Sequence, residues 1–131
     1  MQSKEVIHLT QVLGEKFLKQ HIILTTVESC TGGLLAAQLT NIPGCSTWFD
    51  RGFITYSNQS KIDCVGVKKS TIKTYGAVSQ QTANEMALGG TNNSKANLGF
   101  SITGIAGPSG GSILKPVGTV FFAIARKQNI I

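Results

Sequence analysis

Residues 28–33 are Glu28-Ser29-Cys30-Thr31-Gly32-Gly33, and the rest of the chain is organised around this turn. An apolar run typical of a β-strand precedes it at residues 22–27, and residues 34–39 have the composition of a helix. A strand that enters a helix through such a turn presents the unpaired first N–H groups of the helix to whatever lies in front of them. Negative charge is favoured at the same place. We therefore expect the chemistry of the protein at this turn.

Three side chains of the turn carry a hydroxyl or a thiol, and each has two interpretations. Ser29 is either a nucleophile whose oxyanion the nearby N–H groups stabilise, or a helix cap together with Thr31. Cys30 competes as a nucleophile, because a helix N-terminus lowers the pKa of a thiol. The chain has only two histidines, His8 and His21, in the first predicted helix and just before the first strand. Their positions disfavour both a Cys-His pair and a Ser-His-Asp triad.

Length and composition indicate one globular domain over residues 1–131, with 41% hydrophobic and 14% charged residues. The three cysteines show no C-x-x-C spacing, which disfavours a disulfide framework or a zinc cluster and fits a reducing cytosol. No signal peptide or membrane-spanning run is recognisable. We predict a cytoplasmic protein without a bound metal and without a membrane partner.

The net charge of +6 permits three interpretations. It can serve solubility, it can attract a phosphate-bearing ligand, or it can mark a nucleic-acid surface. The lysines are scattered, and one tryptophan and two tyrosines offer little stacking surface, which disfavours nucleic acid.

Hydrophobic periodicity and turn signals divide the chain into alternating strands and helices. We predict helices over residues 3–20, 31–40, 59–65, 70–75 and 79–90, and strands over 22–28, 47–56, 96–103 and 117–125. Val6, Leu9, Leu13 and Phe17 form the apolar stripe of the first helix, and Ser79 caps the last one, whose Ala83, Met86 and Ala87 face inward. This alternation predicts an α/β layered sheet.

A serine nucleophile without histidine needs another base, and Lys61 is the candidate. Lysine can act as a base when burial or nearby positive charge makes its neutral form accessible. Lys61 follows the second strand by one helical turn, and Tyr56 at the end of that strand could relay a proton or bind substrate. The structural alternatives are a solvated helix lysine and a half-buried strand tyrosine.

A glycine-rich loop follows the third strand and runs from Gly104 to Gly111. Glycine allows close approach of backbone N–H groups to a ligand, although such a loop can also be a simple turn. It matches neither a P-loop nor a dinucleotide fingerprint. Because the carboxyl ends of parallel strands share one edge of a sheet, we predict that this loop, the Ser29 turn and Lys61 meet there.

Five motifs in this order resemble the CinA C-terminal domain family, the nicotinamide-nucleotide amidases, from about residue 5 to residue 125. They are residues 27–33 (Val-Glu-Ser-Cys-Thr-Gly-Gly), 43–46 (Pro-Gly-Cys-Ser), 56–61 (Tyr-Ser-Asn-Gln-Ser-Lys), 76–79 (Gly-Ala-Val-Ser) and 103–108 (Thr-Gly-Ile-Ala-Gly-Pro).

The resemblance implies hydrolysis of the carboxamide of nicotinamide mononucleotide to nicotinate mononucleotide and ammonia. It implies that Ser29 is the nucleophile, Lys61 the base and Tyr56 its partner. The substrate-binding residues it implies are Thr31, Gly32, Gly33, Ser46, Thr103, Gly104 and Gly107, with Thr31–Gly33 as helix cap and oxyanion wall. It further implies a three-layer α/β/α sandwich around a mixed, mostly parallel sheet, no metal or organic cofactor, a pyridine nucleotide as partner, and assembly into a homo-oligomer.

Two departures from the family pattern leave an alternative open. The chain stops at Ile131, where the family continues into a closing helix with an arginine, so we expect a domain that lacks this helix. Either the first helix covers that face of the sheet, or the chain is shorter than its fold. The alternative function is a catalytically impaired nucleotide-binding protein. The N-terminal domain of long family members is also absent, which resembles the stand-alone form.

Overall fold

A computed structural model of the chain describes residues 3–127 and 129–131. Its five strands form one sheet in the order β2-β1-β3-β4-β5. The strands are β1 (Leu24–Glu28), β2 (Phe49–Ile54), β3 (Leu98–Gly104), β4 (Val120–Arg126) and β5 (Asn129–Ile130). The helices are α1 (Lys4–Lys19), α2 (Leu34–Thr40), α3 (Asn58–Val65), α4 (Lys69–Tyr75) and α5 (Gln80–Asn92), with a short 3₁₀ turn at Cys45–Thr47.

The sheet is mixed, as predicted. Strand β1 pairs in parallel with both β2 and β3, whereas β3–β4 and β4–β5 are antiparallel. The predicted strands and helices are all present, and among the described residues the short 3₁₀ turn and the two-residue strand β5 were not indicated by sequence patterns. Because β1 lies between two parallel neighbours, the turn after Glu28 opens at the carboxyl edge of three strands.

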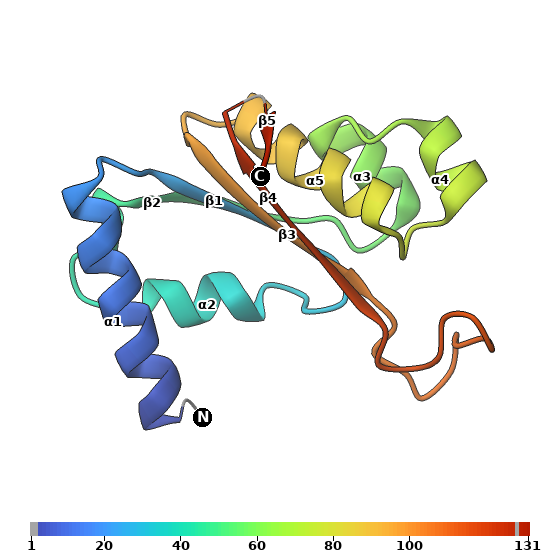
Figure 1. Ribbon diagram of the computed structural model, residues 1–131, viewed down its shortest axis with the longest axis horizontal. Helices are drawn as coiled ribbons and strands as arrows, with labels where there is room; N and C mark the ends of the chain where they lie inside the picture. The colour runs from blue at the N-terminus through green and yellow to red at the C-terminus, as the bar shows by residue number, and fades with distance from the viewer. Residues whose placement is uncertain (1–2, 128) are drawn as a thin grey trace.

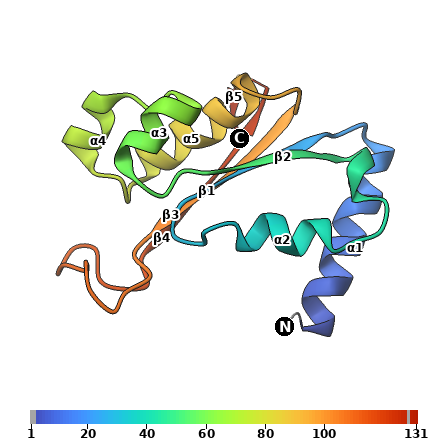
Figure 2. The ribbon, with the colours of Figure 1, turned by 180° about the vertical axis from the view of Figure 1, so that it is seen from behind.

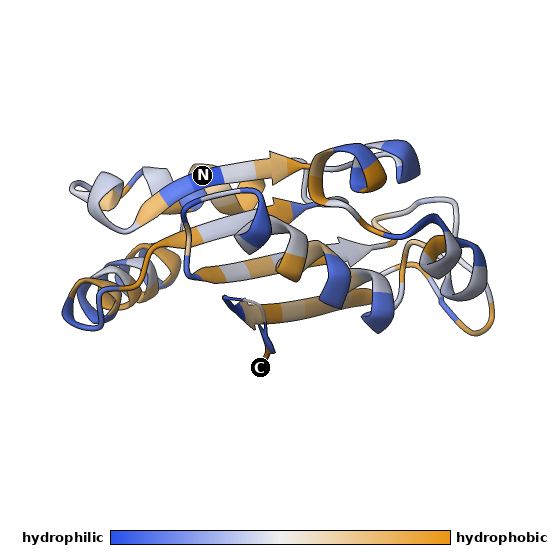
Figure 3. Cartoon of the chain, turned by 90° about the horizontal axis from the view of Figure 1, so that it is seen from above, coloured by the Kyte–Doolittle hydropathy of each residue, from blue (hydrophilic) through white to orange (hydrophobic). Residues whose placement is uncertain are grey.

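The helices form a layer on each face of the sheet, which confirms the three-layer arrangement. Helices α1 and α2 lie on one side, and α3, α4 and α5 lie on the other (Figures 1 and 2). Figure 3 shows hydrophobic residues recurring along the strands, while hydrophilic residues gather on the helices and loops. The segment between β3 and β4 projects away from the sheet as a long loop (Figure 1).

Helix α5 packs closely on the sheet through small residues. Ala83 and Ala87 contact Ala123 and Ala125 of β4, and Met86 joins a second cluster, so the predicted inward face of α5 is confirmed. Gly90 is required by the close contact, since a Cβ there would lie 2.6 Å from Cγ2 of Val27. The side-chain oxygen of Ser79 accepts the N–H of Thr82, which confirms the predicted cap.

The buried face of α1 agrees with the predicted stripe only at Phe17, which packs against the core cluster that contains Trp48. Thr10 and Gly14 are buried, whereas Val6, Leu9 and Leu13 are exposed. The cause is Trp48, whose ring approaches α1 so closely that a Cβ on Gly14 would lie 2.9 Å from Nε1. The face of α1 that packs against Trp48 is therefore determined by Gly14, a residue that does not contribute to the hydrophobic periodicity of the helix.

The layer formed by α1 and α2 does not extend over β4. Phe122 is 53% exposed and Ile124 38% exposed, while the alternating Ala123 and Ala125 are buried against α5 on the other face. Helix α1 thus covers this face of the sheet only in part.

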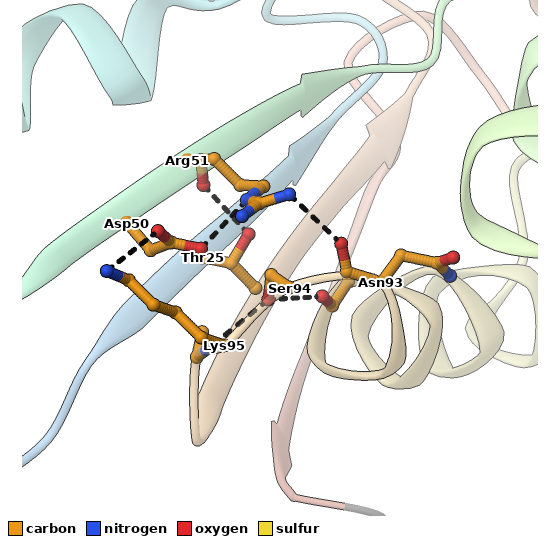
Figure 4. Close-up of polar contacts among 8 residues, drawn as sticks. Thr25, Asp50, Arg51, Asn93, Ser94 and Lys95 are labelled. Carbon is orange, nitrogen blue, oxygen red and sulfur yellow. Dashed lines mark hydrogen bonds and ion pairs between the residues drawn. The ribbon is translucent and has the colours of Figure 1, made fainter.

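Polar contacts tie β2 to the end of α5, near the amino edge of the sheet (Figure 4). The Asp50 carboxylate pairs with Arg51 at 2.8 Å and with Lys95 at 3.9 Å. Arg51 also donates to the carbonyl of Asn93, and its own carbonyl accepts the Thr25 hydroxyl. These contacts hold the amino edge of the sheet, opposite the edge at which the Ser29 turn opens.

Candidate active site

The carboxyl ends of β1, β2 and β3 open into one cavity of about 350 Å³. The Ser29 turn, the segment after β2 with Lys61, and the glycine-rich loop all contribute to its wall, which confirms that they meet at one edge of the sheet. The described residues that line it are Ser29, Cys30, Tyr56, Asn58, Lys61, Ala77, Val78, Thr103, Gly104, Ile105, Ala106, Gly107, Ser109 and Gly110. Lys61 is the one lysine, arginine, aspartate or glutamate among them.

Ser29 and Lys61 are hydrogen-bonded inside this cavity. The Ser29 Oγ lies 3.0 Å from the Lys61 Nζ, and both residues are buried. The backbone of Ser29 is fixed as well, because its N–H donates to the carbonyl of Ile102 and its carbonyl accepts the N–H of Gly32. The hydroxyl is therefore held at the end of the central strand and aimed at the amine.

Lys61 is only 1% exposed, and its amine is surrounded by oxygen acceptors. Besides Ser29, the carbonyl oxygens of Thr55 at 2.7 Å and Tyr56 at 3.3 Å lie within hydrogen-bond distance of Nζ. The salt bridges found among the described residues involve Asp50 and not Lys61. Helix α3 delivers the side chain, and Ser57, whose side chain accepts the N–H of Ser60, caps that helix.

Burial lowers the pKa of the Lys61 amine, because the charged form loses its hydration; the nearby Cys30 opposes this shift. A neutral amine has two N–H groups and one lone pair. In the charged form, Nζ donates to Ser29 Oγ and to the carbonyls of Thr55 and Tyr56. In the neutral form, its two N–H groups can keep the carbonyls while its lone pair accepts the Ser29 hydroxyl. This arrangement suits a general base.

Burial acts in the opposite direction on Cys30, whose thiol pKa it raises. The N–H groups of Cys30 and Thr31 and the charge of Lys61 lower this pKa, while Glu28 raises it, but desolvation is the largest cause. The thiol form is therefore favoured, which makes Cys30 the weaker nucleophile although it lines the same cavity.

Tyr56 lies at the cavity with its side chain 74% exposed. Its contact with Lys61 is made by the backbone carbonyl oxygen, and Thr55, fully buried, provides the shorter one. The predicted pairing of the Tyr56 side chain with Lys61 is therefore not among the contacts that the structure describes. The contact between the Thr55 carbonyl and the Lys61 amine was not predicted from the sequence.

The turn after Ser29 differs in part from the predicted helix cap. Helix α2 begins at Leu34, and its N-cap is Gly33 in the left-handed conformation (φ 102°), without a capping side-chain bond. The cap comes instead from Glu28, whose Oε1 accepts the N–H of Leu35 at 2.9 Å and whose Oε2 accepts that of Ala36 at 3.0 Å. The predicted cap within Thr31–Gly33 is therefore confirmed in position, since Gly33 is the N-cap residue. The N–H groups of Leu35 and Ala36, however, are accepted by Glu28 and not by a side chain of this turn.

The glycine-rich loop forms the opposite wall. Thr103, Gly104 and Gly107 all line the cavity, as do the apolar Ile105 and Ala106. The Thr103 hydroxyl donates to the carbonyl of Ala77 at 2.8 Å, which holds the segment before α5 against the site. Ala77 and Val78 enter the wall in this way, although neither carries a chemical signal in the sequence.

Four residues predicted to bind substrate are not among those that line the cavity. Thr31, Gly32 and Gly33 lie beyond Cys30 in the same turn. Ser46 lies in the 3₁₀ turn that precedes β2, at the amino edge of the sheet and thus opposite Ser29. Of the four, Ser46 is remote from Ser29, whereas the N–H of Gly32 contacts the Ser29 carbonyl. The contact of all four with substrate stays a prediction.

Within residues 3–127 and 129–131, no cluster of three or more His, Cys, Asp or Glu side chains is placed to hold a metal ion. None of the helices described in that part of the chain is long and apolar enough to cross a membrane.

Comparison with known proteins adds relatives over nearly the whole chain. Residues 6–131 match the family described as CinA C-terminal domain. The nicotinamide-nucleotide amidohydrolase PncC of Enterobacter agglomerans is 49% identical over 128 residues, which cover 98% of this chain and 78% of that protein. A putative competence-damage inducible protein of Caldicellulosiruptor bescii is 52% identical over 119 residues, 91% of this chain but 28% of that longer protein.

Solved structures agree with this assignment. The crystal structure of the competence/damage inducible protein CihA from Agrobacterium tumefaciens superposes with a TM-score of 0.96 at 44% identity. The superposition covers 100% of this chain and 80% of the chain in that crystal structure. With the motifs, the fold and the sequence match in accord, the chain belongs to the CinA C-terminal domain family.

Proposed function

We propose that this chain is a nicotinamide-nucleotide amidohydrolase that converts nicotinamide mononucleotide to nicotinate mononucleotide and ammonia. The observation that carries the proposal is the 3.0 Å contact between the Ser29 Oγ and the buried Lys61 Nζ, in a cavity that holds no other lysine, arginine or carboxylate among its described lining residues. A relative at 49% identity is named for this activity.

The reaction begins with neutral Lys61. Its two N–H groups donate to the carbonyls of Thr55 and Tyr56, and its lone pair accepts the proton of Ser29 as the Ser29 oxygen attacks the carboxamide carbon. The protonated Lys61 then gives this proton to the leaving nitrogen, and ammonia departs. A water molecule, deprotonated in the same way, hydrolyses the acyl–serine ester and restores Ser29.

The negative oxygen of the tetrahedral intermediate needs hydrogen-bond donors near Ser29. The N–H groups of Leu35 and Ala36 are occupied by Glu28, and that of Gly32 by the carbonyl of Ser29. The N–H groups of Cys30 and Thr31 act on the Cys30 sulfur, which lies in the cavity wall. We assign these two N–H groups as the oxyanion donors.

The test is ammonia release from nicotinamide mononucleotide by the purified chain, with chromatography of the nucleotide product. The expected result is stoichiometric ammonia and nicotinate mononucleotide, abolished by Ser29→Ala. Calorimetric binding of the nucleotide without ammonia release would overturn the proposal and favour the nucleotide-binding alternative.

A further inference from the structure

Glu28 is a buried carboxylate next to the nucleophile, and the reaction steps above do not use it. It is 1% exposed, and it belongs to the central strand β1, where it pairs with Ile54 of β2 and Ile102 of β3. A buried charge is costly unless hydrogen bonds satisfy it. The hydrogen-bond partners of the Glu28 carboxylate indicate the role of this residue.

The side chain of Glu28 holds the start of helix α2. Its two oxygens accept the N–H groups of Leu35 and Ala36, seven and eight residues further on. Gly33, the N-cap residue of α2, has no side chain to satisfy these donors locally. Bonds to an ionised acceptor are stronger than bonds between neutral groups. The five residues from Ser29 to Gly33 therefore form a turn whose two ends are both fixed by Glu28.

The backbone of Glu28 reaches the other half of the catalytic pair. Its carbonyl accepts the N–H of Thr55 at 2.8 Å, and the carbonyl of Thr55 in turn accepts from the Lys61 amine at 2.7 Å. Glu28 is thus one residue from Ser29 along the chain and two hydrogen bonds from Lys61 across the sheet.

From these contacts we infer that Glu28 is a positioning residue, whose carboxylate clamps α2 to the end of β1 and thereby holds the Ser29 hydroxyl against Lys61. The inference rests on the proposed function, in which Ser29 is the nucleophile. Catalysis by a nucleophile and a base depends on their mutual geometry, and small displacements cost large factors in rate.

A glutamine at this position isolates the contribution of the second oxygen. Glu28→Gln keeps the size of the side chain and one acceptor, but its NH₂ group then faces the second backbone N–H, and one anchor is lost. Glu85→Gln is the matched control. The carboxylate of Glu85 also accepts a backbone N–H, that of Lys68, in a part of the chain that does not line the cavity.

The measurement is the rate constant for covalent labelling of Ser29 by a fluorophosphonate probe, together with its end point and with kcat and KM for nicotinamide mononucleotide. For Glu28→Gln we expect a labelling rate constant about 10- to 100-fold below that of the unaltered chain, an unchanged end point of one label per chain, and a fall in kcat with KM nearly constant. Glu85→Gln should match the unaltered chain in all four quantities.

A purely structural role predicts another pattern. If Glu28→Gln lowers the melting temperature or the labelled fraction while the rate constant stays within twofold, the inference is overturned. Should that variant not fold, Glu28→Asp, which keeps the charge and loses one methylene, is judged by the same rate constant. An unaltered chain that neither labels nor releases ammonia would instead refute the proposed function, and the inference with it.

Discussion

The hydroxyl of Ser29 lies 3.0 Å from the amine of Lys61, a residue 32 positions later in the chain. Ser29 follows the end of β1 and Lys61 lies in helix α3. The backbone of Ser29 is held by Ile102 and Gly32, and the amine of Lys61 by the carbonyl of Thr55. We expect them to act as a unit. Ser29→Ala and Lys61→Met should each lower kcat by about 10³-fold, and the double variant should lose little more.

The measurement for this pair is steady-state ammonia release by the three variants and the unaltered chain. Lys69→Met, which removes an exposed lysine of α4, is the control and should keep the full rate. Additive losses, with the double variant far slower than either single one, would contradict a shared step.

The pH dependence of the reaction should follow the protonation of Lys61. Burial lowers the pKa of this amine, and in the proposed mechanism the active form is the neutral one. Below that pKa the amine carries a proton and cannot accept one from Ser29, so kcat/KM should rise with pH as Lys61 loses its proton. A profile of kcat/KM from pH 5 to pH 10 checks this. A rate that falls steadily over the same range would show that a protonated group is needed instead.

Cys30 should be dispensable even though its thiol lines the cavity. Its raised pKa favours the thiol over the reactive thiolate. We expect Cys30→Ala to keep activity within about threefold, and iodoacetamide to alkylate Cys30 more slowly than a free thiol at pH 7, followed by mass spectrometry of the peptide. A 100-fold loss in Cys30→Ala would return the nucleophile assignment to this residue.

The phenol of Tyr56 should contribute less than the sequence suggests. The contact that Tyr56 makes with Lys61 uses the carbonyl oxygen, and a substitution of the side chain preserves it. Tyr56→Phe should therefore retain kcat within about threefold, whereas a general acid–base group typically contributes about 10²-fold or more. Measuring kcat and KM for Tyr56→Phe distinguishes a minor role of the phenol from proton transfer. A fall in kcat of about 10²-fold or more would assign the phenol a proton-transfer role.

Much of this site could be predicted because its strand ends carry local signals. The hydroxyl turn after β1 and the glycine-rich loop after β3 are recognisable in sequence, and parallel pairing places both at one edge. Lys61 is recognisable only as a lysine one turn after a strand. Its burial follows from the packing of α3, whose Val65 clusters with Val27 of β1 and Met86 of α5. The roles of Thr55 and Ala77 could not be predicted, since each contributes a backbone carbonyl that any residue type has.

Two features of the structure, the capping role of Glu28 and the buried face of α1, could not be predicted from the sequence for related reasons. Glu28 caps a helix from seven residues away, whereas capping patterns are recognised within a few residues of the helix start. The stripe of α1 was expected at Leu9 and Leu13, but the helix packs through Gly14 because Trp48 occupies that space. In both cases a contact distant in sequence overrides a local pattern.

Burial of Lys61 should also lower the stability of the fold, and the pH dependence of this effect is a further prediction. The pKa of this amine is lower in the folded chain than in the unfolded one, so unfolding takes up a proton at pH values between the folded and the unfolded pKa. The folded state therefore pays a penalty that is complete below the folded pKa and disappears as pH rises past the unfolded pKa. Lys61→Met has no such penalty, although it leaves the carbonyls of Thr55 and Tyr56 without the amine.

The free energy of unfolding of the unaltered chain should consequently rise relative to that of Lys61→Met between pH 7 and pH 10. Urea unfolding at several pH values measures this difference, and Lys69→Met provides the baseline for loss of an exposed lysine. A difference that is independent of pH would mean that Lys61 carries its proton equally well in both states. In that case the amine would not be the neutral base that the hydrolysis of an amide by Ser29 requires.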